Sequence, residues 1–411
     1  MKILILQDDF PPHHAGGAAV VAYNLAKGFK KSGHDILVIT TVQKRSLVGR
    51  ETMDGIEVER LFSEYHERWR GYLSLYNPQT IPALKKIMKK WQPDIVHVHN
   101  VHWYLSYHSL KIAGYTGAKV FLTAHDGMLF HYGKPHDDKR VSALELMKSY
   151  RLRYNPLRNY CIRRYLRYVT NIVAVSDALK RALNNNDISN VHVIHNGIDV
   201  ERWIEPEESV ETFKKHYGLG DSVILFGGRL SGSKGAGKMI EALDIIVKTI
   251  PNTQLLIVGQ KDAYAQKMLV QAQERGVVDG ILFTGWISGH ILHQAYHAAS
   301  VVAVPSLYLD PFPTVNLEAM ACNKPVVATC FGGSVEVVSD GITGYIVDPF
   351  DVPTMAAKIA EILKDKEKKK VFGQAGYEKV TKEFTLEKQT ATYERIFVSS
   401  GKDAESLNTV I

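Results

Sequence analysis

The chain has 411 residues, which is enough for two domains of ordinary size that each bury their own core. Hydrophobic residues make up 45% and charged residues 23%, a balance that excludes a disordered, collagen-like or disulfide-stapled protein. The formal net charge of +7 is unevenly placed: residues 1–196 carry 28 Lys and Arg against 16 Asp and Glu, whereas residues 197–411 carry 22 against 27. The basic half and the mildly acidic half are therefore expected to meet different partners.

The cellular compartment is predicted from cysteines and apolar runs. Cys161, Cys322 and Cys330 have no metal-ligand spacing and are odd in number, which favours a reducing cytosol. No apolar run approaches the roughly 18 residues that span a bilayer. We expect a cytoplasmic protein, either soluble or peripheral at the inner face of the membrane.

The N-terminal half begins as a strand and a helix joined by a long loop. Lys2–Leu6 is the predicted strand and Ala18–Lys31 the predicted helix. Gly16 and Gly17 end the loop, where bare backbone amides allow a phosphate or a sugar to approach closely. A tight turn without a ligand is the alternative. No G-x-G-x-x-G pattern follows the strand, so a nicotinamide cofactor is not expected.

Three histidines lie on or just after the predicted strand Asp94–Asn100. His97 and His99 share one face of it, and His102 follows. Zinc is one interpretation, but no acid or thiol completes a ligand set. Packing or substrate contact is therefore favoured.

The next predicted strand, Lys119–Ala124, is followed by His125 and Asp126. Catalytic loops of α/β folds lie at the carboxyl ends of strands, so both side chains are candidate site residues. The alternative for Asp126 is that it caps the helix after it.

Lys148–Tyr168 is a basic and aromatic segment. It holds seven Lys and Arg and five tyrosines but no Asp or Glu, and Pro156 divides it into two expected helical pieces. This composition suits an anionic surface, and membrane headgroups are favoured because no RNA- or DNA-binding module accompanies it. A solvated face or packing within the fold is the alternative. We expect an anionic membrane partner and no nucleic acid.

The C-terminal half opens with the predicted strand Ser222–Arg229 and a glycine-rich turn. Arg229 and Lys234 stand five residues apart across this turn, before a helix predicted to run to Lys248. A guanidinium fork, an ammonium group and bare amides at a helix N-terminus form a clamp suited to a diphosphate. Two unrelated surface cations are the alternative. The spacing is not that of a Walker A loop.

A second strand, exit loop and helix follow later in this half. The apolar run Val301–Val304 is typical of a buried parallel strand. Pro305–Pro313 is the predicted exit loop, and Thr314 is the expected N-cap of a short helix. Lys324–Thr329 then returns as the next strand. Ligands of open α/β sheets lie just outside such strand ends, and a helix N-terminus there attracts anions.

Two carboxylates flank this helix start. Asp310 lies on the exit loop and Glu318 within the helix, while Thr314 and Val315 occupy its anion-attracting N-terminus. Carboxylates beside an anion site are unsuited to binding phosphate. They are suited to accept hydrogen bonds from neutral hydroxyls, such as those of a ribose or a hexose.

The pair Asp310-x7-Glu318 resembles the acid-x7-acid signature of retaining glycosyltransferases of family 4, and Gly-Arg-Leu-x3-Lys-Gly at 228–235 is similar to a second motif of that family. Family members usually have Glu where Asp310 stands and Gly where Pro313 stands. The resemblance implies the GT-B fold, an α/β architecture of two Rossmann-like doubly wound domains facing across a cleft. The expected domains are 1–196 and 197–384, with a C-terminal helix at about 385–411 packing back on the first.

The resemblance also implies roles for individual residues. Glu318 would hold the ribose diol, Asp310 the hydroxyls of the donor sugar, and Arg229 with Lys234 the diphosphate. Further implied contacts are Gly16 and Gly17 beside the diphosphate and acceptor, His125 at the donor sugar, Asp126 at the acceptor, and Gly259, Trp286 and Ile287 at the nucleotide.

The implied reaction is transfer of a sugar from a nucleotide diphospho-sugar to a hydroxyl of a glycan or lipid-linked acceptor, with retention of anomeric configuration. The loop Ser288–His290 offers no carboxylate to a guanine edge, which favours a UDP-sugar over a GDP-sugar. The two clamp cations would replace a metal, so neither metal nor cofactor is expected. A nucleotide-sugar 2-epimerase of the same fold and a non-enzymatic basic protein that binds lipid or RNA are the alternatives.

Overall fold

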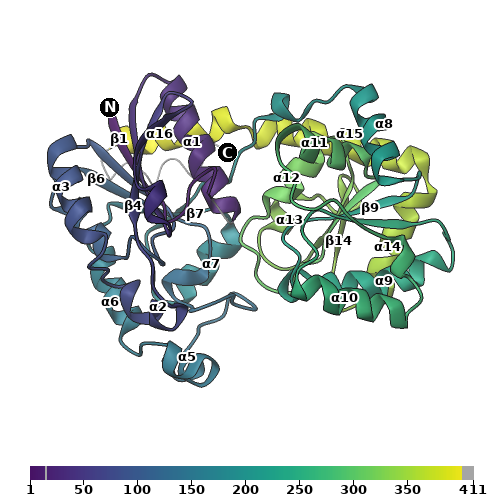
Figure 1. Cartoon of the computed structure of the whole chain (residues 1–411), viewed down its shortest axis with the longest axis horizontal. Helices are drawn as coiled ribbons and strands as arrows, with labels where there is room; N and C mark the ends of the chain where they lie inside the picture. The colour runs from purple at the N-terminus through teal and green to yellow at the C-terminus, as the bar shows by residue number, and fades with distance from the viewer. Residues whose placement is uncertain (14–15, 400–411) are drawn as a thin grey trace. The chain divides into compact units, whose positions relative to one another are not determined.

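The computed structural model describes residues 1–13 and 16–399, and the chain divides into two units (Figure 1). Unit 1 comprises Met1–Asn196 and the segment from Leu386 onward, and unit 2 comprises Gly197–Thr385. The last part of the expected C-terminal helix, 400–411, lies outside the described residues. Within the described ranges, every helix is too short or too polar to cross a bilayer.

Unit 1 is built on one twisted, mainly parallel sheet. Its strands are β1 (Lys2–Leu6), β2 (Asp35–Val42), β3 (Gly49–Met53), β4 (Ile56–Phe62), β5 (Ile95–Val98), β6 (Lys119–Ala124), β7 (Asn171–Ala174) and β8 (Val191–Val193). Their order is β3-β4-β2-β1-β5-β6-β7-β8, and only the β3–β4 pairing is antiparallel. Because the strand order reverses between β1 and β5, the switch point where such sheets bind ligands lies at the carboxyl ends of these two strands.

The helices of unit 1 include one contributed by the end of the chain. They are α1 (Gly17–Lys31), α2 (Arg70–Leu73), α3 (Ile81–Trp91), α4 (His108–Gly114), α5 (Ala143–Tyr150), α6 (Arg158–Leu166), α7 (Asp177–Asn185) and α16 (Leu386–Val398). The ring of Phe29 on α1 lies 6.3 Å from that of Tyr393 and 5.5 Å from that of Phe397, both on α16. α16 therefore completes the core of unit 1 although unit 2 separates it from the rest in sequence.

Unit 2 has a six-stranded parallel sheet. Its strands are β9 (Val223–Phe226), β10 (Gln254–Ile257), β11 (Ile281–Phe283), β12 (Val301–Val304), β13 (Val326–Thr329) and β14 (Gly344–Val347), in the order β11-β10-β9-β12-β13-β14. This is the strand order of a Rossmann fold, with the switch point between β9 and β12. The predicted bounds of β12 are confirmed.

The helices of unit 2 enclose this sheet. They are α8 (Glu207–Tyr217), α9 (Ala236–Val247), α10 (Ala263–Glu274), α11 (Gly289–Ala298), α12 (Thr314–Ala321), α13 (Ser334–Val337), α14 (Val352–Lys364) and α15 (Lys366–Glu383). The prediction that Thr314 caps α12 is wrong. Pro313 is the N-cap residue, and Thr314 is the first helical residue, whose hydroxyl donates to Glu318 at 3.0 Å.

The basic segment Lys148–Tyr168 forms the end of α5, a short turn and α6, with the expected break at Pro156. Two of its seven cations have partners inside unit 1. Arg158 is fully buried, donates to the carbonyl oxygen of Met128 and lies over the ring of Tyr107. Arg163 donates to the carbonyl oxygen of Asn186 at 2.9 Å. The five that remain exposed, without a side-chain hydrogen bond or ion pair to another described residue, are Lys148, Arg151, Arg153, Arg164 and Arg167.

Candidate functional site

The exit loops of β9 and β12 meet at the switch point of unit 2. The backbone N–H of Leu307 donates to the carbonyl oxygen of Ser233 at 2.8 Å, which fixes one loop on the other. The ammonium group of Lys234 donates to the carboxylate of Asp310, and the hydroxyl of Ser306 donates to the same carboxylate oxygen at 2.7 Å. Lys234 and Asp310, 76 residues apart, are thus brought together in one ion pair.

Arg229 stands apart from this pair. Its side chain is exposed, and it makes no hydrogen bond or ion pair with another residue of the described ranges. Lys234, by contrast, is mostly buried but has three N–H donors, so its bond to Asp310 leaves donors for a further acceptor. The two cations on this loop can therefore face an anion together.

A glycine allows the loop to lie so close to β12. Gly235 has φ +81°, and a Cβ atom there would lie 2.0 Å from the carbonyl oxygen of Pro305. A larger residue would have to push the two exit loops apart.

We therefore expect Gly235→Ala to weaken nucleotide binding and to lower the melting temperature. The left-handed conformation alone costs about 1–2 kcal/mol for a residue with a Cβ, and the overlap adds to it. Gly237→Ala is the matched control, because its Cβ would meet only the side-chain oxygen of Gln271 at an ordinary 3.4 Å. Thermal unfolding and UDP titration of both variants measure the difference, and equal behaviour would show that the loop tolerates a side chain.

Glu318 lies on α12 beside this loop pair. Its carboxylate accepts hydrogen bonds from the hydroxyls of Tyr296 and Thr314, one on each oxygen. Burial raises the pKa of Glu318 above its usual range. Asp310 and Glu318 thus have separate sets of partners, and a ribose diol at Glu318 would have to use its remaining lone pairs.

The loops after β10 and β11 lie side by side. Gly259 pairs with Gly285 in an isolated bridge, and the next residue, Trp286, is 68% exposed. Ile287 is half-buried. A carboxylate does lie near this loop, since Glu205 is 2.7 Å from Nδ1 of His290, a proximity that the local sequence could not reveal. Because the Glu205 side chain is only 2% exposed, it does not offer a free edge to a guanine base.

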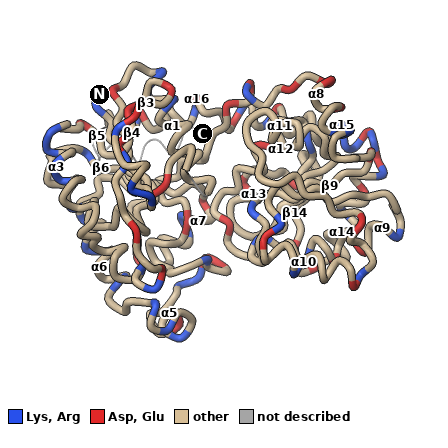
Figure 2. Tube along the Cα trace, in the orientation of Figure 1, with Lys and Arg blue, Asp and Glu red and all other residues tan. Residues whose placement is uncertain are grey.

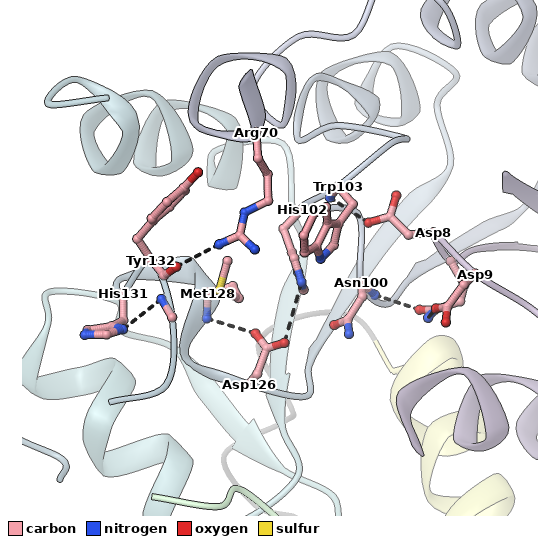
Figure 3. Close-up of polar contacts among 12 residues, drawn as sticks. Asp8, Asp9, Arg70, Asn100, His102, Trp103, Asp126, Met128, His131 and Tyr132 are labelled. Atoms are coloured by element: carbon pink, nitrogen blue, oxygen red, sulfur yellow. Dashed lines mark hydrogen bonds and ion pairs between the residues drawn. The ribbon is translucent and has the colours of Figure 1, made fainter. Parts of the chain in front are cut away.

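In unit 1 the polar residues also gather at the carboxyl ends of the strands (Figure 3). Asp8, just after β1, accepts hydrogen bonds from the backbone N–H groups of Trp103, Tyr104 and Leu105 at 2.7–2.8 Å. Burial raises the pKa of Asp8 to about 7, although these three bonds favour its charged form. Asp8 therefore ties the loop after β1 to the loop after β5.

Asp126 and His102 lie beside this junction. One oxygen of Asp126 accepts from the backbone N–H of Met128 at 2.9 Å and so caps the 3₁₀ turn Gly127–Leu129, the structural alternative considered for it. The other oxygen lies 3.7 Å from Nε2 of His102 (Figure 3). Burial lowers the pKa of His102 to about 4, so this imidazole is neutral at pH 7. Asp126 is half-buried and keeps lone pairs for another donor.

His125 forms a pair with His99. Their Nε2 and Nδ1 atoms are 2.8 Å apart, and their rings stack. Burial lowers the pKa of His125 to about 4, so it serves as a neutral hydrogen-bonding group. His97 contacts the hydroxyl of Thr123 at 2.8 Å. These contacts agree with packing, rather than zinc binding, as the role of the histidines on this strand.

Arg70 was not predicted from the sequence. Its guanidinium lies 4.4 Å from the ring centroids of Trp103 and Tyr132 and donates to the carbonyl oxygen of Tyr132 at 2.7 Å (Figure 3). Arg70 belongs to no recognisable sequence motif, so only the folded structure shows that its guanidinium lies near His102. Gly16 and Gly17 lie at the exposed N-terminus of α1 in the same unit.

Two family models match consecutive parts of the chain. Glycosyltransferase Family 4 matches residues 15–202, and Glycosyl transferases group 1 matches residues 209–379. Together they span most of the sequence and follow the division into two units.

Similar proteins agree with these matches. An uncharacterized glycosyltransferase of Methanocaldococcus jannaschii is 27% identical over 89% of this chain and 90% of its own length. A GDP-mannose-dependent phosphatidylinositol monomannoside mannosyltransferase of Mycolicibacterium smegmatis is 33% identical over 44% of this chain and 49% of its own. The structure of HepE from Anabaena, solved with UDP and glucose, matches with a TM-score of 0.73 at 21% identity, over 97% of this chain and 100% of that one. The chain belongs to the group 1 glycosyltransferases and has the GT-B fold.

Proposed function

We propose that the donor is a UDP-sugar and that its diphosphate is held by Arg229 and Lys234. The observation that carries this proposal is the pair of cations on a glycine-rich loop at the switch point of unit 2, next to the N-terminus of α9. HepE, a protein of this fold, was solved with UDP. The loop Ser288–His290, which has no carboxylate, and the enclosed Glu205 favour uridine over guanosine, although one relative is named for GDP-mannose.

The proposed chemistry is transfer with retention of anomeric configuration. Negative charge grows on the diphosphate as the glycosidic bond breaks, and the two cations stabilise it. Asp310 would orient the sugar through its hydroxyls, and Glu318 the ribose. We assign no nucleophile: a diphosphate oxygen takes the proton of the attacking hydroxyl. His125 would contact the donor sugar and Asp126 the acceptor hydroxyl, which belongs to a glycan or a lipid-linked sugar.

Labelled UDP- and GDP-sugars, each with and without a lipid extract, test this function. A glycosylated product with the anomeric configuration of the donor, formed faster from a UDP-sugar, is expected. Free sugar with UDP and no need for an acceptor would instead indicate a 2-epimerase. Absence of any turnover across the donor set would leave only a binding protein.

We expect transfer to continue in EDTA, because two side-chain cations take over the role of a metal at the leaving diphosphate. The initial rate with excess EDTA should remain within about twofold of the untreated rate, a difference worth less than about 0.5 kcal/mol. Complete loss of activity, restored by magnesium or manganese, would contradict a metal-independent clamp.

We further propose that unit 1 docks on an anionic membrane, where a lipid-linked acceptor would lie. The support is a set of exposed residues, here called the docking face, whose members are Leu144, Met147, Lys148, Arg151, Leu152, Arg153, Leu157, Tyr160, Arg164 and Arg167. All ten are exposed, and Leu152, between the two helices, is 93% exposed. Figure 2 marks the basic positions on and beside α5 and α6.

The spacing of the docking-face residues along the two helices favours a membrane surface as their partner. Leu144, Met147 and Lys148 are three and four residues apart on α5, and so lie on one side of it. Leu157, Tyr160, Arg164 and Arg167 follow the same spacing along α6. Apolar side chains among unpaired cations suit the boundary between acyl chains and anionic headgroups.

Vesicle co-sedimentation is expected to show binding to anionic lipid that falls at high salt and is weak on neutral lipid. Each cation near an anionic surface contributes about 1 kcal/mol, so Arg164→Glu with Arg167→Glu should weaken binding at least about tenfold. Leu152→Asp should weaken it as well. Lys30→Glu with Lys31→Glu, exposed residues at the end of α1, is the matched control. Equal partitioning on both lipids, or an unchanged charge-reversed variant, would end the membrane proposal.

A further inference from the structure

Two histidines and one glutamate converge in unit 2, away from the Lys234–Asp310 pair. Glu205 lies in the segment before α8, and His290 and His293 lie in the first turns of α11. One oxygen of Glu205 is 2.7 Å from Nδ1 of His290 and 3.2 Å from Nδ1 of His293. The three ligand atoms all lie within 4.8 Å of one another.

The carboxylate of Glu205 needs a cation. Its side chain is 2% exposed, and no Lys or Arg of the described ranges forms an ion pair with it. Buried carboxylates are expensive unless they are paired with a cation or coordinate a metal. The nearest partners of the Glu205 carboxylate are the two imidazole nitrogens, which are ligands that zinc accepts.

We propose that Glu205, His290 and His293 form a site for a divalent transition metal, with Zn²⁺ as the best-suited ion. Zinc takes carboxylate oxygen and imidazole nitrogen at about 2.0–2.2 Å, which places neighbouring ligand atoms of a tetrahedron about 3.3–3.5 Å apart. The distance of 3.2 Å between Glu205 and His293 is close to this separation, whereas the 2.7 Å between Glu205 and the exposed His290 is a direct hydrogen-bond distance that would have to lengthen around an ion. Magnesium and calcium prefer oxygen ligands, so imidazole nitrogens select against them.

The surroundings of the three side chains fit such a site. The indole ring of Trp203 lies 4.4 Å from the ring of His293 and restricts its orientation. The hydroxyl of Ser209 lies 3.5 Å from the second oxygen of Glu205, although its nearer acceptor is the carbonyl oxygen of Pro206 at 2.7 Å. His290 is 82% exposed, which gives an ion a path from solvent and leaves a coordination position for water.

A metal here would join two segments of unit 2 that are distant in sequence. It would tie the start of α8 to the start of α11, three residues beyond Trp286 in the loop proposed to meet the nucleobase. The expected consequence is a more stable unit 2. The inference does not rest on the proposed donor or on catalysis, because its ligands are separate from the diphosphate clamp.

Titration of the full-length chain with Zn²⁺ after treatment with a chelator and its removal tests the site. We expect one tight binding event, a rise in melting temperature with zinc, and a visible absorption band with Co²⁺ whose intensity reports the coordination geometry of the bound ion. His290→Gln, at a side chain that is 82% exposed, should weaken zinc binding at least about tenfold, as loss of even an outer partner of a metal site commonly does. Glu205→Gln should do the same.

His216→Gln serves as the matched control, since His216 is an exposed histidine on α8 outside the cluster. It should bind zinc as tightly as the unaltered chain. Absence of zinc binding at 100-fold molar excess would overturn the site. Equal zinc affinity in His290→Gln and Glu205→Gln would overturn it too, because the ion would then be held elsewhere. Zinc affinity and melting temperature are both measured without sugar transfer.

Discussion

Lys234→Ala is expected to lower kcat/KM for sugar transfer at least about tenfold. A hydrogen bond to a charged group is worth about 1.5–3 kcal/mol, and each 1.4 kcal/mol is a factor of ten in rate. The loss should appear mainly in kcat, because the charge on the diphosphate is greatest as the leaving group departs. Arg229→Ala should have an effect of similar size, since its exposed guanidinium has no other partner in the described chain.

The structure adds a control to this experiment. Because Lys234 is ion-paired with Asp310, its removal also leaves a buried carboxylate whose one remaining hydrogen-bond partner among the described residues is Ser306. The melting temperature of each variant must therefore be measured together with its rate, so that lost stability is not mistaken for lost catalysis. Lys238→Ala, which removes a cation paired with Glu241 one turn into α9, is the matched control and should be nearly silent. Near-normal kcat/KM for both Lys234→Ala and Arg229→Ala would refute the clamp.

Asp310→Asn is expected to reduce transfer at least about tenfold while changing UDP affinity little. An amide replaces only part of the acceptor capacity of a carboxylate, so bonds to sugar hydroxyls are weakened. UDP carries no hexose, and the change releases Lys234 from its ion pair, so the diphosphate should lose no attraction. The comparison of kcat/KM with the Kd for UDP separates the two effects.

Asp279→Asn is the control for that comparison, since Asp279 is an exposed carboxylate before β11 that forms no hydrogen bond or ion pair with another described residue. It should alter neither rate nor affinity. A loss of UDP binding in Asp310→Asn as large as its loss of transfer would move Asp310 out of the sugar pocket.

Much of the sheet of unit 2 is predictable because its strands are buried on both faces. Val301–Val304 is a continuous apolar run between a serine and a proline, and the strand has these bounds. The edge of unit 1 is different. β3, Gly49–Met53, is almost wholly exposed, and its polar composition gives no strand signal, so only its pairing with β4 reveals it.

The sequence predicts which segments carry the candidate site, but it does not predict the contacts between their side chains. Local sequence patterns predict Arg229, Lys234 and Asp310 as site residues, but the ion pair between the last two depends on two exit loops meeting at a switch point. Arg158 shows the same limit. It belongs to a run of surface cations by composition, yet it is four residues before Ile162 and shares the buried side of α6 with it.

The measurement that tests the central claim most directly is calorimetric titration of the unaltered chain and of Lys234→Ala with UDP and with uridine. The account predicts that the unaltered chain binds UDP much more tightly than uridine, because the diphosphate meets two cations. In Lys234→Ala the affinity for UDP should fall about tenfold or more, and that for uridine should stay the same. Equal affinities of the two proteins for UDP would contradict a diphosphate clamp at this loop.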